Sequence, residues 1–148
     1  MTTETEETPR AANLFRRVIE EGFNRGNFDA WDGCFPERYA EHQDGHPSTL
    51  AEFKRTVGAL RHAFPDLHLT IEELITRGDK VWARMTARGT HLGPFMGFAP
   101  TEKPFTITVI DICRVAHGRI VEHWGVPDRF ALLRQLGLLP PPSTPAAG

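Results

Sequence analysis

The stretch LHLTIEELITRGDKVWARMTARGTH, residues 67–91, decides the fold class of this chain. It indicates two strands, over 67–76 and 81–90, joined by the turn RGDK. Apolar and polar residues alternate in the second strand, as they do in strands of an antiparallel sheet. Two further strands follow over 105–115 and 120–126, with the turn AHGR between them. We therefore expect a long antiparallel meander in the C-terminal half of the chain.

Helical patterns lie mostly before these strands. Their expected starts are Thr8 before Pro9, Asn27, Thr49 with Glu52 as a capping box, and Asp128, whose helix covers 128–136. Helices followed by an antiparallel meander indicate an α+β fold rather than a parallel sheet with crossover helices.

Length and composition suit one ordinary domain. The chain has 148 residues, and we expect the domain over 9–139, with disordered tails over 1–8 and 140–148. A net charge of −2 without a Lys/Arg stripe argues against nucleic acid as a partner. Without a signal-like segment or an apolar run that spans a bilayer, we expect a cytoplasmic protein with no membrane partner. Cys34 and Cys113 match no paired spacing, which indicates free thiols.

Strand alternation places side chains on two faces of the expected sheet. Trp82, Arg84 and Thr86 share one face of the strand over 81–90, opposite the face of Ala83. Neither face of the sheet is cleanly polar, so both faces need cover. Helices and a cavity can take one side, and a second copy of the chain can take the other. We therefore expect a homodimer or a higher homo-oligomer.

A polar cluster lies in RIVEHWGVPDRF, residues 119–130. Alternation divides it, because Glu122 and Trp124 share one face of the strand and His123 lies on the other. We expect Trp124 to face the cavity, since an indole suits an apolar wall with one polar group. In the preceding strand Asp111 lies among apolar residues and must find a partner there. A buried aspartate paired with Arg84 or Arg114 explains this placement as well as a catalytic aspartate does.

Several motifs resemble the SnoaL-like polyketide cyclase family, within the wider nuclear-transport-factor-2-like superfamily. They are FPD, GDKV, GTHLGPFMGFAPT and GRIVEHW followed by an aspartate, and the resemblance spans residues 14–138. It implies a cone-shaped α+β barrel, in which a strongly bent, mostly antiparallel sheet wraps around N-terminal helices. One deep, mostly apolar pocket is expected inside. The fold hosts many reactions, so these motifs indicate the architecture more specifically than the chemistry.

The resemblance also implies a reaction. Family cyclases close a ring of a polyketide by intramolecular aldol condensation, without metal or cofactor, and an aspartate near the end of the sheet serves as acid and base. By motif position that aspartate is Asp128 here. The reaction needs a base for a proton flanked by carbonyls, and then a donor to the new alkoxide. One carboxylate in an apolar pocket can perform both steps.

Asp128 has a structural interpretation as well. It stands directly before the last expected helix, and aspartate is a favoured N-cap. A carboxylate that accepts backbone N–H bonds is a weaker base, so the two roles compete. Some of the resembling cyclases carry a helper histidine near the position of Cys113, where this chain has none. His42 and His91 are the candidates to replace it.

Other site classes are less well supported. Superfamily epoxide hydrolases resemble the strand VWARMT but place an aspartate two residues after its arginine. Here Arg84 is followed by Thr86, which counts against epoxide hydrolysis, and Arg84 remains a candidate to polarise a carbonyl. The histidines around Gly45 lack a further ligand, so no metal site is expected. No GxGxxG or P-loop motif is present, so no nucleotide cofactor is expected.

The expected site therefore has two parts. Asp128, Arg84 and His42 are the candidates for catalysis. The expected substrate pocket comprises Trp124, Glu122, Trp82, Thr86, His91, Asp111, Cys113, Phe95 and Met96. The leading hypothesis is a cofactor-independent cyclase of an apolar, carbonyl-bearing small molecule. The alternatives are an isomerase, dehydratase or hydrolase of the same superfamily, a non-catalytic protein that binds an apolar ligand, and a structural dimer module.

Overall fold

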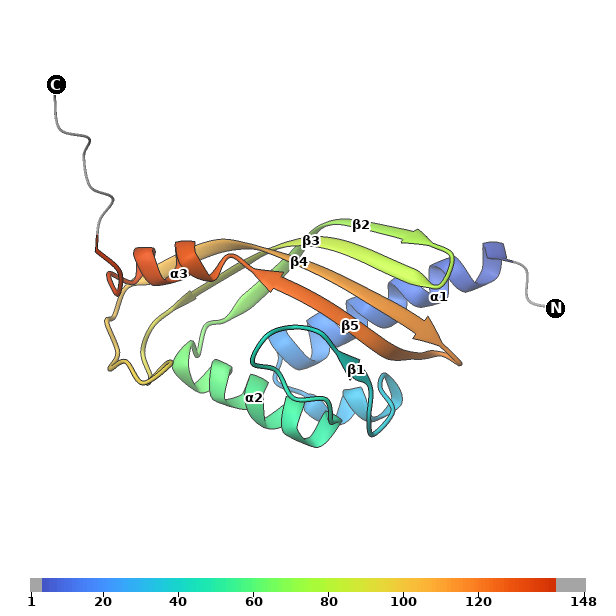
Figure 1. Cartoon of the computed structure of the whole chain (residues 1–148), viewed down its shortest axis with the longest axis horizontal. Helices are drawn as coiled ribbons and strands as arrows, with labels where there is room; N and C mark the ends of the chain where they lie inside the picture. Colours follow the sequence, from blue (N-terminus) through green and yellow to red (C-terminus); the bar gives the residue numbers. More distant parts are fainter. Residues whose placement is uncertain (1–3, 141–148) are drawn as a thin grey trace, which may run out of the picture.

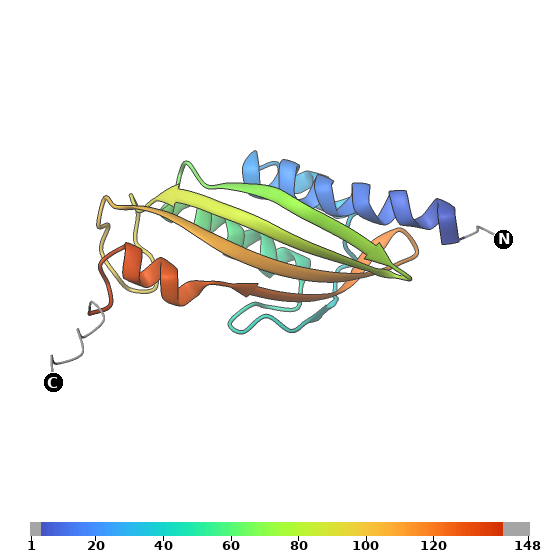
Figure 2. The ribbon, with the colours of Figure 1, turned by 90° about the horizontal axis from the view of Figure 1, so that it is seen from above.

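The computed structural model describes residues 4–140, so the expected tail residues 1–3 and 141–148 lie outside the described residues. The chain forms an α+β fold in which helices cover one face of a five-stranded sheet (Figure 1). Seen from above, helix α2 lies behind the long strands, and helix α1 runs beside β2 (Figure 2). The sheet is open and bends over the helices, which agrees with the expected cone-shaped architecture.

The sheet has the strand order β1-β5-β4-β3-β2, and its last four strands form the antiparallel meander expected from the sequence. Their bounds are β2 His68–Arg77, β3 Lys80–Thr90, β4 Pro104–Ala116 and β5 Arg119–Pro127. In the turn between β4 and β5, His117 and Gly118 have φ angles of 54° and 71°. A tight two-residue hairpin needs such positive angles, because they match the twist of the strands.

The helical layer contains segments of three kinds. They are the α-helices α1 Glu4–Arg17, α2 Leu50–Ala63 and α3 Arg129–Gln135, the π-helical η1 Val18–Asn24 and the 3₁₀-helical η2 Phe28–Gly33. Helix α1 begins before Thr8, its expected cap, and contains Pro9. Proline near the start of a helix sacrifices few hydrogen bonds, so the helix can extend back across it.

The other expected helix starts are confirmed. Thr49 Oγ1 accepts the backbone N–H of Glu52 at 3.3 Å and donates to the Glu52 carboxylate at 2.6 Å. Asp128 caps α3, because its Oδ1 accepts the N–H of Ala131 at 3.0 Å. Asn27 precedes η2, although its side chain makes no capping bond.

A short strand, β1 Ala40–Glu41, joins the sheet beside β5. It runs parallel to β5, with Ala40 opposite Glu122 and Glu41 opposite His123. The backbone N–H of His42 donates to the carbonyl of His123 at 2.9 Å and extends this contact. The pairing places the polar residues that follow β1 against the last strand of the sheet.

A β-bulge decides which side chains of β5 face the helices. The hairpin begins with Val115 opposite Ile120, but the next residue, Arg114, lies opposite Glu122. Val121 is therefore an extra residue in β5. A shift of one residue moves every later side chain to the other face of the strand. Beyond the bulge, the odd-numbered residues of β5 face the helices.

The helical layer is built around Trp31, which is fully buried. Its indole N–H donates to the carbonyl of Val18 at 3.0 Å, and its ring stacks on Phe53 with centroids 4.8 Å apart. Gly22 lies directly against the indole, where a Cβ would be 2.0 Å from Trp31 Cε2. Further ring contacts to Trp31 come from Phe23, Phe28 and Phe35. One aromatic cluster therefore joins η1, η2 and α2.

The close contact at Gly22 predicts a large effect of one methyl group. Gly22→Ala should lower the free energy of unfolding by about 1–3 kcal/mol or more, because Trp31 cannot move away without disturbing the cluster. Gly33→Ala is the matched control, since no atom lies within 4 Å of a Cβ there. It should change stability by less than about 0.5 kcal/mol. Urea unfolding followed by tryptophan fluorescence measures both, and equal losses would contradict the prediction.

Candidate functional site

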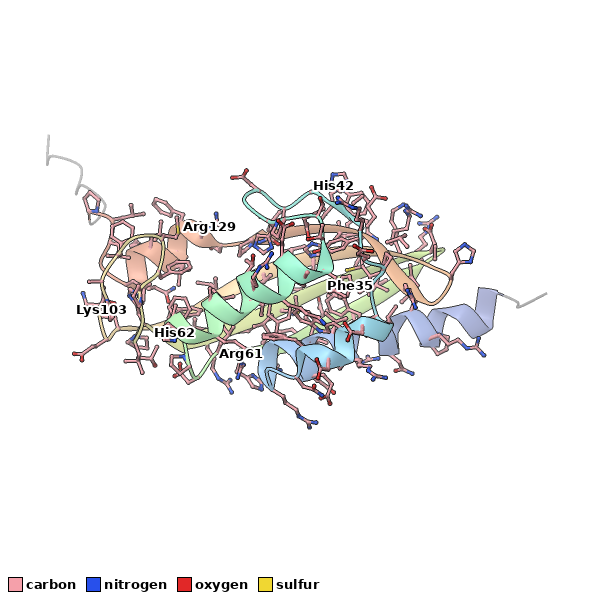
Figure 3. All side chains as sticks on the ribbon, turned by 90° about the horizontal axis from the view of Figure 1, so that it is seen from below. Phe35, His42, Arg61, His62, Lys103 and Arg129 are labelled. Atoms are coloured by element: carbon pink, nitrogen blue, oxygen red, sulfur yellow. The ribbon has the colours of Figure 1, made fainter. Side chains whose placement is uncertain are left out.

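A cavity of about 440 Å³ lies between the sheet and the helical layer. Most of its wall is apolar and comes from η1, α2 and β4, whereas polar groups gather where β1 meets β5. Seen from below, the wall residue Phe35 lies beside the start of α2 (Figure 3). A mostly apolar cavity with a few convergent polar groups is the usual form of a small-molecule site.

Three titratable side chains meet at the polar end of the cavity. On β5, His123 Nδ1 lies 2.7 Å from Glu41 Oε1 of β1, and His123 Nε2 lies 3.4 Å from Asp111 Oδ1 of β4. Their side chains are 12%, 1% and 11% exposed, respectively. The backbone N–H of Gln43 also donates to Glu41 at 2.9 Å. This arrangement depends on the strand order, because β5 lies between β1 and β4.

The two carboxylates control the protonation of His123. Burial by itself would lower the pKa of His123, but the hydrogen bonds and charges of Asp111 and Glu41 outweigh burial and raise it to about 10. Burial would likewise raise the pKa of Glu41, yet the hydrogen bond and charge of His123 hold it below its ordinary value. His123 is therefore an imidazolium at neutral pH, held between two acidic side chains.

Tyr39, Gln43 and His46 complete the polar end of the cavity. The Gln43 amide nitrogen lies 3.0 Å from His46 Nε2. Burial lowers the pKa of His46, so its ring is neutral at neutral pH. Burial, followed by the charge of the nearby Glu41, raises the pKa of Tyr39, so its hydroxyl keeps its proton. These side chains are neutral donors and acceptors beside the charged group.

Gly125 makes room for this arrangement. It lies opposite Asp111 in the register of β4 and β5. A Cβ at this position would be 2.1 Å from Gln43 Oε1 and 2.8 Å from Asp111 Oδ1. A glycine inside a strand often marks such a close approach of other groups. The absence of a side chain at this position is therefore part of the construction of the site.

Four of the expected pocket residues line the cavity, namely Phe95, Met96, Asp111 and Cys113. The partner of Asp111 is His123, not Arg84 or Arg114, which were the partners considered from the sequence. Burial, followed by the charge of Asp111, raises the pKa of Cys113 well above its ordinary value. Cys113 is therefore a neutral thiol in the cavity wall rather than a nucleophilic thiolate.

Trp124, Glu122 and His42 lie on the outer face of the sheet, which corrects the face expected for Trp124. The bulge at Val121 is the reason, because without it Glu122 and Trp124 would share the face of Cys113. The His42 ring stacks on Trp124 with centroids 4.8 Å apart, and His42 Nε2 lies 2.8 Å from Glu122 Oε2. Figure 3 shows His42 at the periphery of the molecule.

Trp82, Arg84 and Thr86 also lie on the outer face and do not line the cavity. Arg84 pairs with Glu73 at 3.2 Å, and Thr86 donates to Glu72 at 2.9 Å. The indole of Trp82 is 48% exposed. The alternation expected from the sequence holds, but the odd-numbered residues of β3 are the ones that face the helices. The pocket expected around these three residues is therefore corrected.

His91 and Asp128 lie outside the cavity wall as well. His91 is fully buried under the loop after β3, where the backbone N–H of Thr101 donates to its Nδ1 at 3.2 Å. Asp128 is exposed and caps α3, as described above, while the residue after it, Arg129, lines the cavity. Of the three side chains expected to perform catalysis, Asp128, Arg84 and His42, none faces the cavity.

Sequence reasoning missed Glu41, His46 and His123 as site residues. Strand alternation already placed His123 and Trp124 on different faces of β5. Only the choice of which face points into the protein remained open. The bulge that decides this has no clear signal in the sequence. Glu41 could not be found from local patterns, because it reaches His123 across 82 residues through a parallel strand pairing.

Within residues 4–140, no group of three or more His, Cys, Asp and Glu side chains is arranged to hold a metal ion. No helix in this range has both the length and the apolar character needed to cross a membrane. Cys34 and Cys113 are both free thiols, as the sequence indicated.

A bent sheet over helices, enclosing an apolar cavity with one buried cluster of acidic and basic groups, defines an α+β protein of the nuclear-transport-factor-2-like class. Residues 13–136 match the SnoaL-like polyketide cyclase family. The chain belongs to that family, which confirms the resemblance seen in the sequence.

Two of the relatives are named as cyclases. Nogalonic acid methyl ester cyclase of Streptomyces nogalater is 31% identical over 125 residues, which cover 78% of this chain and 89% of that protein. Aklanonic acid methyl ester cyclase AcmA of Streptomyces galilaeus is 38% identical over 61 residues, which cover 41% of this chain and 42% of that protein.

Solved structures show the same fold. TsrD from Streptomyces laurentii superposes with a TM-score of 0.82 at 26% identity, over 94% of this chain and 100% of that chain. Wild-type IdmH from Streptomyces antibioticus superposes with a TM-score of 0.76 at 31% identity, over 86% of this chain and 98% of that chain. The cone-shaped architecture expected from the resemblance is thereby confirmed.

The charge of His123 predicts how stability depends on pH. Its pKa rises from 6.5 to about 10 on folding, so its protonation stabilises the fold fully below pH 6.5 and less as pH rises toward 10. Between pH 6.5 and about 8.5, most ordinary thiols and phenols still keep their protons. In this interval the free energy of unfolding should therefore fall by up to about 1.4 kcal/mol per pH unit because of His123. Urea unfolding at a series of pH values measures this slope.

Two histidine variants serve as controls for this slope. His123→Gln removes the titrating ring and should flatten the dependence, whereas His42→Gln changes an exposed ring on the outer face and should leave it unchanged. A wild-type unfolding free energy that is constant over this interval would contradict a protonated His123. If His123→Gln showed the same slope, the pH dependence would have to come from another titrating group.

Proposed function

We propose that this protein catalyses the intramolecular aldol condensation of an apolar, carbonyl-bearing polyketide, with Asp111 as acid and base. The observation that carries the proposal is the position of Asp111. Its carboxylate lines an apolar cavity, and the His123 ring lies directly beside it. Family membership supports the reaction class, and two relatives named as cyclases of acid methyl esters support a carbonyl-bearing polyketide as substrate.

The proposed reaction removes one proton and returns it. Asp111 takes the proton from a carbon between two carbonyl groups; the C–H electrons form a C=C bond, and the π electrons of one carbonyl move onto its oxygen to give an enolate. The enolate carbon attacks a second carbonyl carbon of the same molecule, and a C–C bond forms. The new alkoxide then takes the proton back from Asp111. This sequence consumes no cofactor, because nothing is oxidised or reduced overall and no group leaves.

His123 and Glu41 are positioning residues in this mechanism. Glu41 holds one ring nitrogen of His123 at 2.7 Å, so the other nitrogen points toward Asp111. A carboxylate fixed by a charged neighbour keeps a single orientation toward a bound substrate. The apolar walls contribute by folding the flexible substrate so that its reacting carbons meet.

The proposal moves the acid/base role from Asp128 to Asp111. Asp128 is exposed, lies outside the cavity wall and caps α3 through Ala131. Arg84, the other candidate from the sequence, pairs with Glu73 on the outer face. Asp111 alone among the expected site residues combines a carboxylate with a place in the cavity wall.

A matched pair of variants tests this assignment. Asp111→Asn removes the base with little change in shape and should lower kcat by about 10²–10⁴-fold. Asp128→Asn keeps a side chain that is favoured as an N-cap, so it should retain turnover within about twofold and similar stability. Cyclisation of linear polyketide esters, followed by chromatography with absorbance detection, measures both.

Two outcomes would contradict the assignment. Full turnover in Asp111→Asn together with its loss in Asp128→Asn would return the acid/base role to Asp128. Tight binding of polyketide esters by the wild-type protein without any turnover would favour the alternative of a non-catalytic ligand-binding protein.

We also propose that a second copy of the chain covers the outer face of the sheet. Trp82, Ile110 and Val126 are 48%, 39% and 69% exposed on this face. The same face carries charges of both signs, such as Arg84 and Glu73. A two-fold contact brings the same patch together twice, so the arginines of one copy can meet the glutamates of the other.

The oligomeric state tests this proposal. Light scattering of the wild-type protein should give twice the mass of one chain, and Ile110→Glu should give the mass of one chain, because a buried unpaired charge disfavours the contact. Leu92→Glu is the control, since Leu92 is 52% exposed but lies in the loop after β3. A wild-type monomer at micromolar concentration, or a dimer that survives Ile110→Glu, would contradict the proposal.

A further inference from the structure

Three buried polar atoms at the polar end of the cavity have no hydrogen-bond partner within residues 4–140. They are the Tyr39 hydroxyl, Glu41 Oε2 and His46 Nδ1, and all three residues line the cavity. Burying a polar atom without a partner is costly, so proteins rarely leave several such atoms together. Three at one end of a cavity indicate a site for a ligand that carries matching polar groups.

The contact with Gln43 fixes the tautomer of His46. Gln43 Nε2 is an amide nitrogen and can only donate, so His46 Nε2 must be the acceptor at 3.0 Å. The proton of the neutral imidazole therefore lies on Nδ1, which is the buried nitrogen without a partner. His46 thus presents an N–H donor at the cavity wall.

Tyr39 presents a second donor in the wall of the same cavity. The rings of Tyr39 and His46 both contact the wall residue Phe53, with centroid distances of 6.2 Å and 6.1 Å. The charges of Glu41, His123, Arg129 and Asp111 all act on His46. Two neutral donors and one carboxylate base therefore line the same cavity.

We propose that the Tyr39 O–H and the His46 Nδ1–H form an oxyanion site that binds the carbonyl oxygen at which the enolate develops. This inference rests on the proposed function, since it names the groups that accept the charge Asp111 creates. Preorganised donors in a site without water stabilise such an oxygen without reorganising during the reaction. The remaining acceptor, Glu41 Oε2, suits a hydroxyl group of the same ligand.

Binding of bicyclic arenes tests the oxyanion site without any turnover. 2-Naphthol carries one hydroxyl oxygen on an apolar body that fits the cavity, and naphthalene is the same body without oxygen. The hydroxyl group makes 2-naphthol more strongly hydrated than naphthalene. Transfer from water into the cavity would therefore by itself favour the binding of naphthalene. We expect the wild-type protein to bind 2-naphthol at least about tenfold more tightly, as one or two good hydrogen bonds allow. Competition for a fluorescent apolar dye measures both dissociation constants.

Three variants separate the donors from the rest of the wall. Tyr39→Phe and His46→Phe should each reduce the preference for 2-naphthol about threefold to tenfold and leave naphthalene affinity nearly unchanged. Phe95→Leu alters an apolar part of the wall and should change both affinities equally.

The inference is overturned if wild-type protein binds naphthalene as tightly as 2-naphthol, or if the double variant of Tyr39 and His46 keeps the full preference. Asp111→Asn distinguishes this failure from failure of the proposed function. That variant should keep the preference for 2-naphthol while it loses turnover. If Asp111→Asn turned over normally and the preference persisted, the donor site would stand and the proposed base would not.

Discussion

The buried ion pair between Glu41 and His123 is the interaction on which the cavity depends. Glu41 comes from β1 and His123 from β5, so the pair ties the edge strand β1 and the loop after it to the end of the meander. Breaking such a pair on one side leaves an uncompensated buried charge, which is strongly destabilising. Asp111 adds a second carboxylate, so the imidazolium is held from both sides. The polar loop with Gln43 and His46 lies over the cavity because this pair holds β1 against β5.

The bulge at Val121 determines which chemistry faces the substrate. With regular pairing, Glu122 and Trp124 would enter the cavity and His123 would lie outside. The extra residue turns His123 inward beside Asp111, and it turns Trp124 outward against His42. Gly125 follows two residues later and leaves the space that Gln43 and Asp111 occupy. The geometry of this site therefore depends both on the extra residue Val121 and on the lack of a side chain at Gly125.

These two features explain how far the sequence could predict the molecule. Alternation and turn residues placed all four long strands within one residue at each end, because local hydrophobic patterns and turn chemistry determine them. The capping box at Thr49 and the cap at Asp128 were equally local and were confirmed. The internal face of β5 depended on a bulge without a local signal. Glu41 and His46 depended on a strand pairing between distant parts of the chain, so neither could be inferred from spacing.

A fixed imidazolium between two carboxylates also holds Asp111 in one orientation at the wall of the apolar cavity. The protonation state of His123 tests this arrangement most directly, by nitrogen-15 NMR of its imidazole ring. At about pH 8, between the ordinary histidine value of 6.5 and the raised pKa of about 10, both ring nitrogens should carry protons. A His123 ring that loses its proton near pH 6.5, as exposed histidines do, would contradict the buried ion pair and the site built on it.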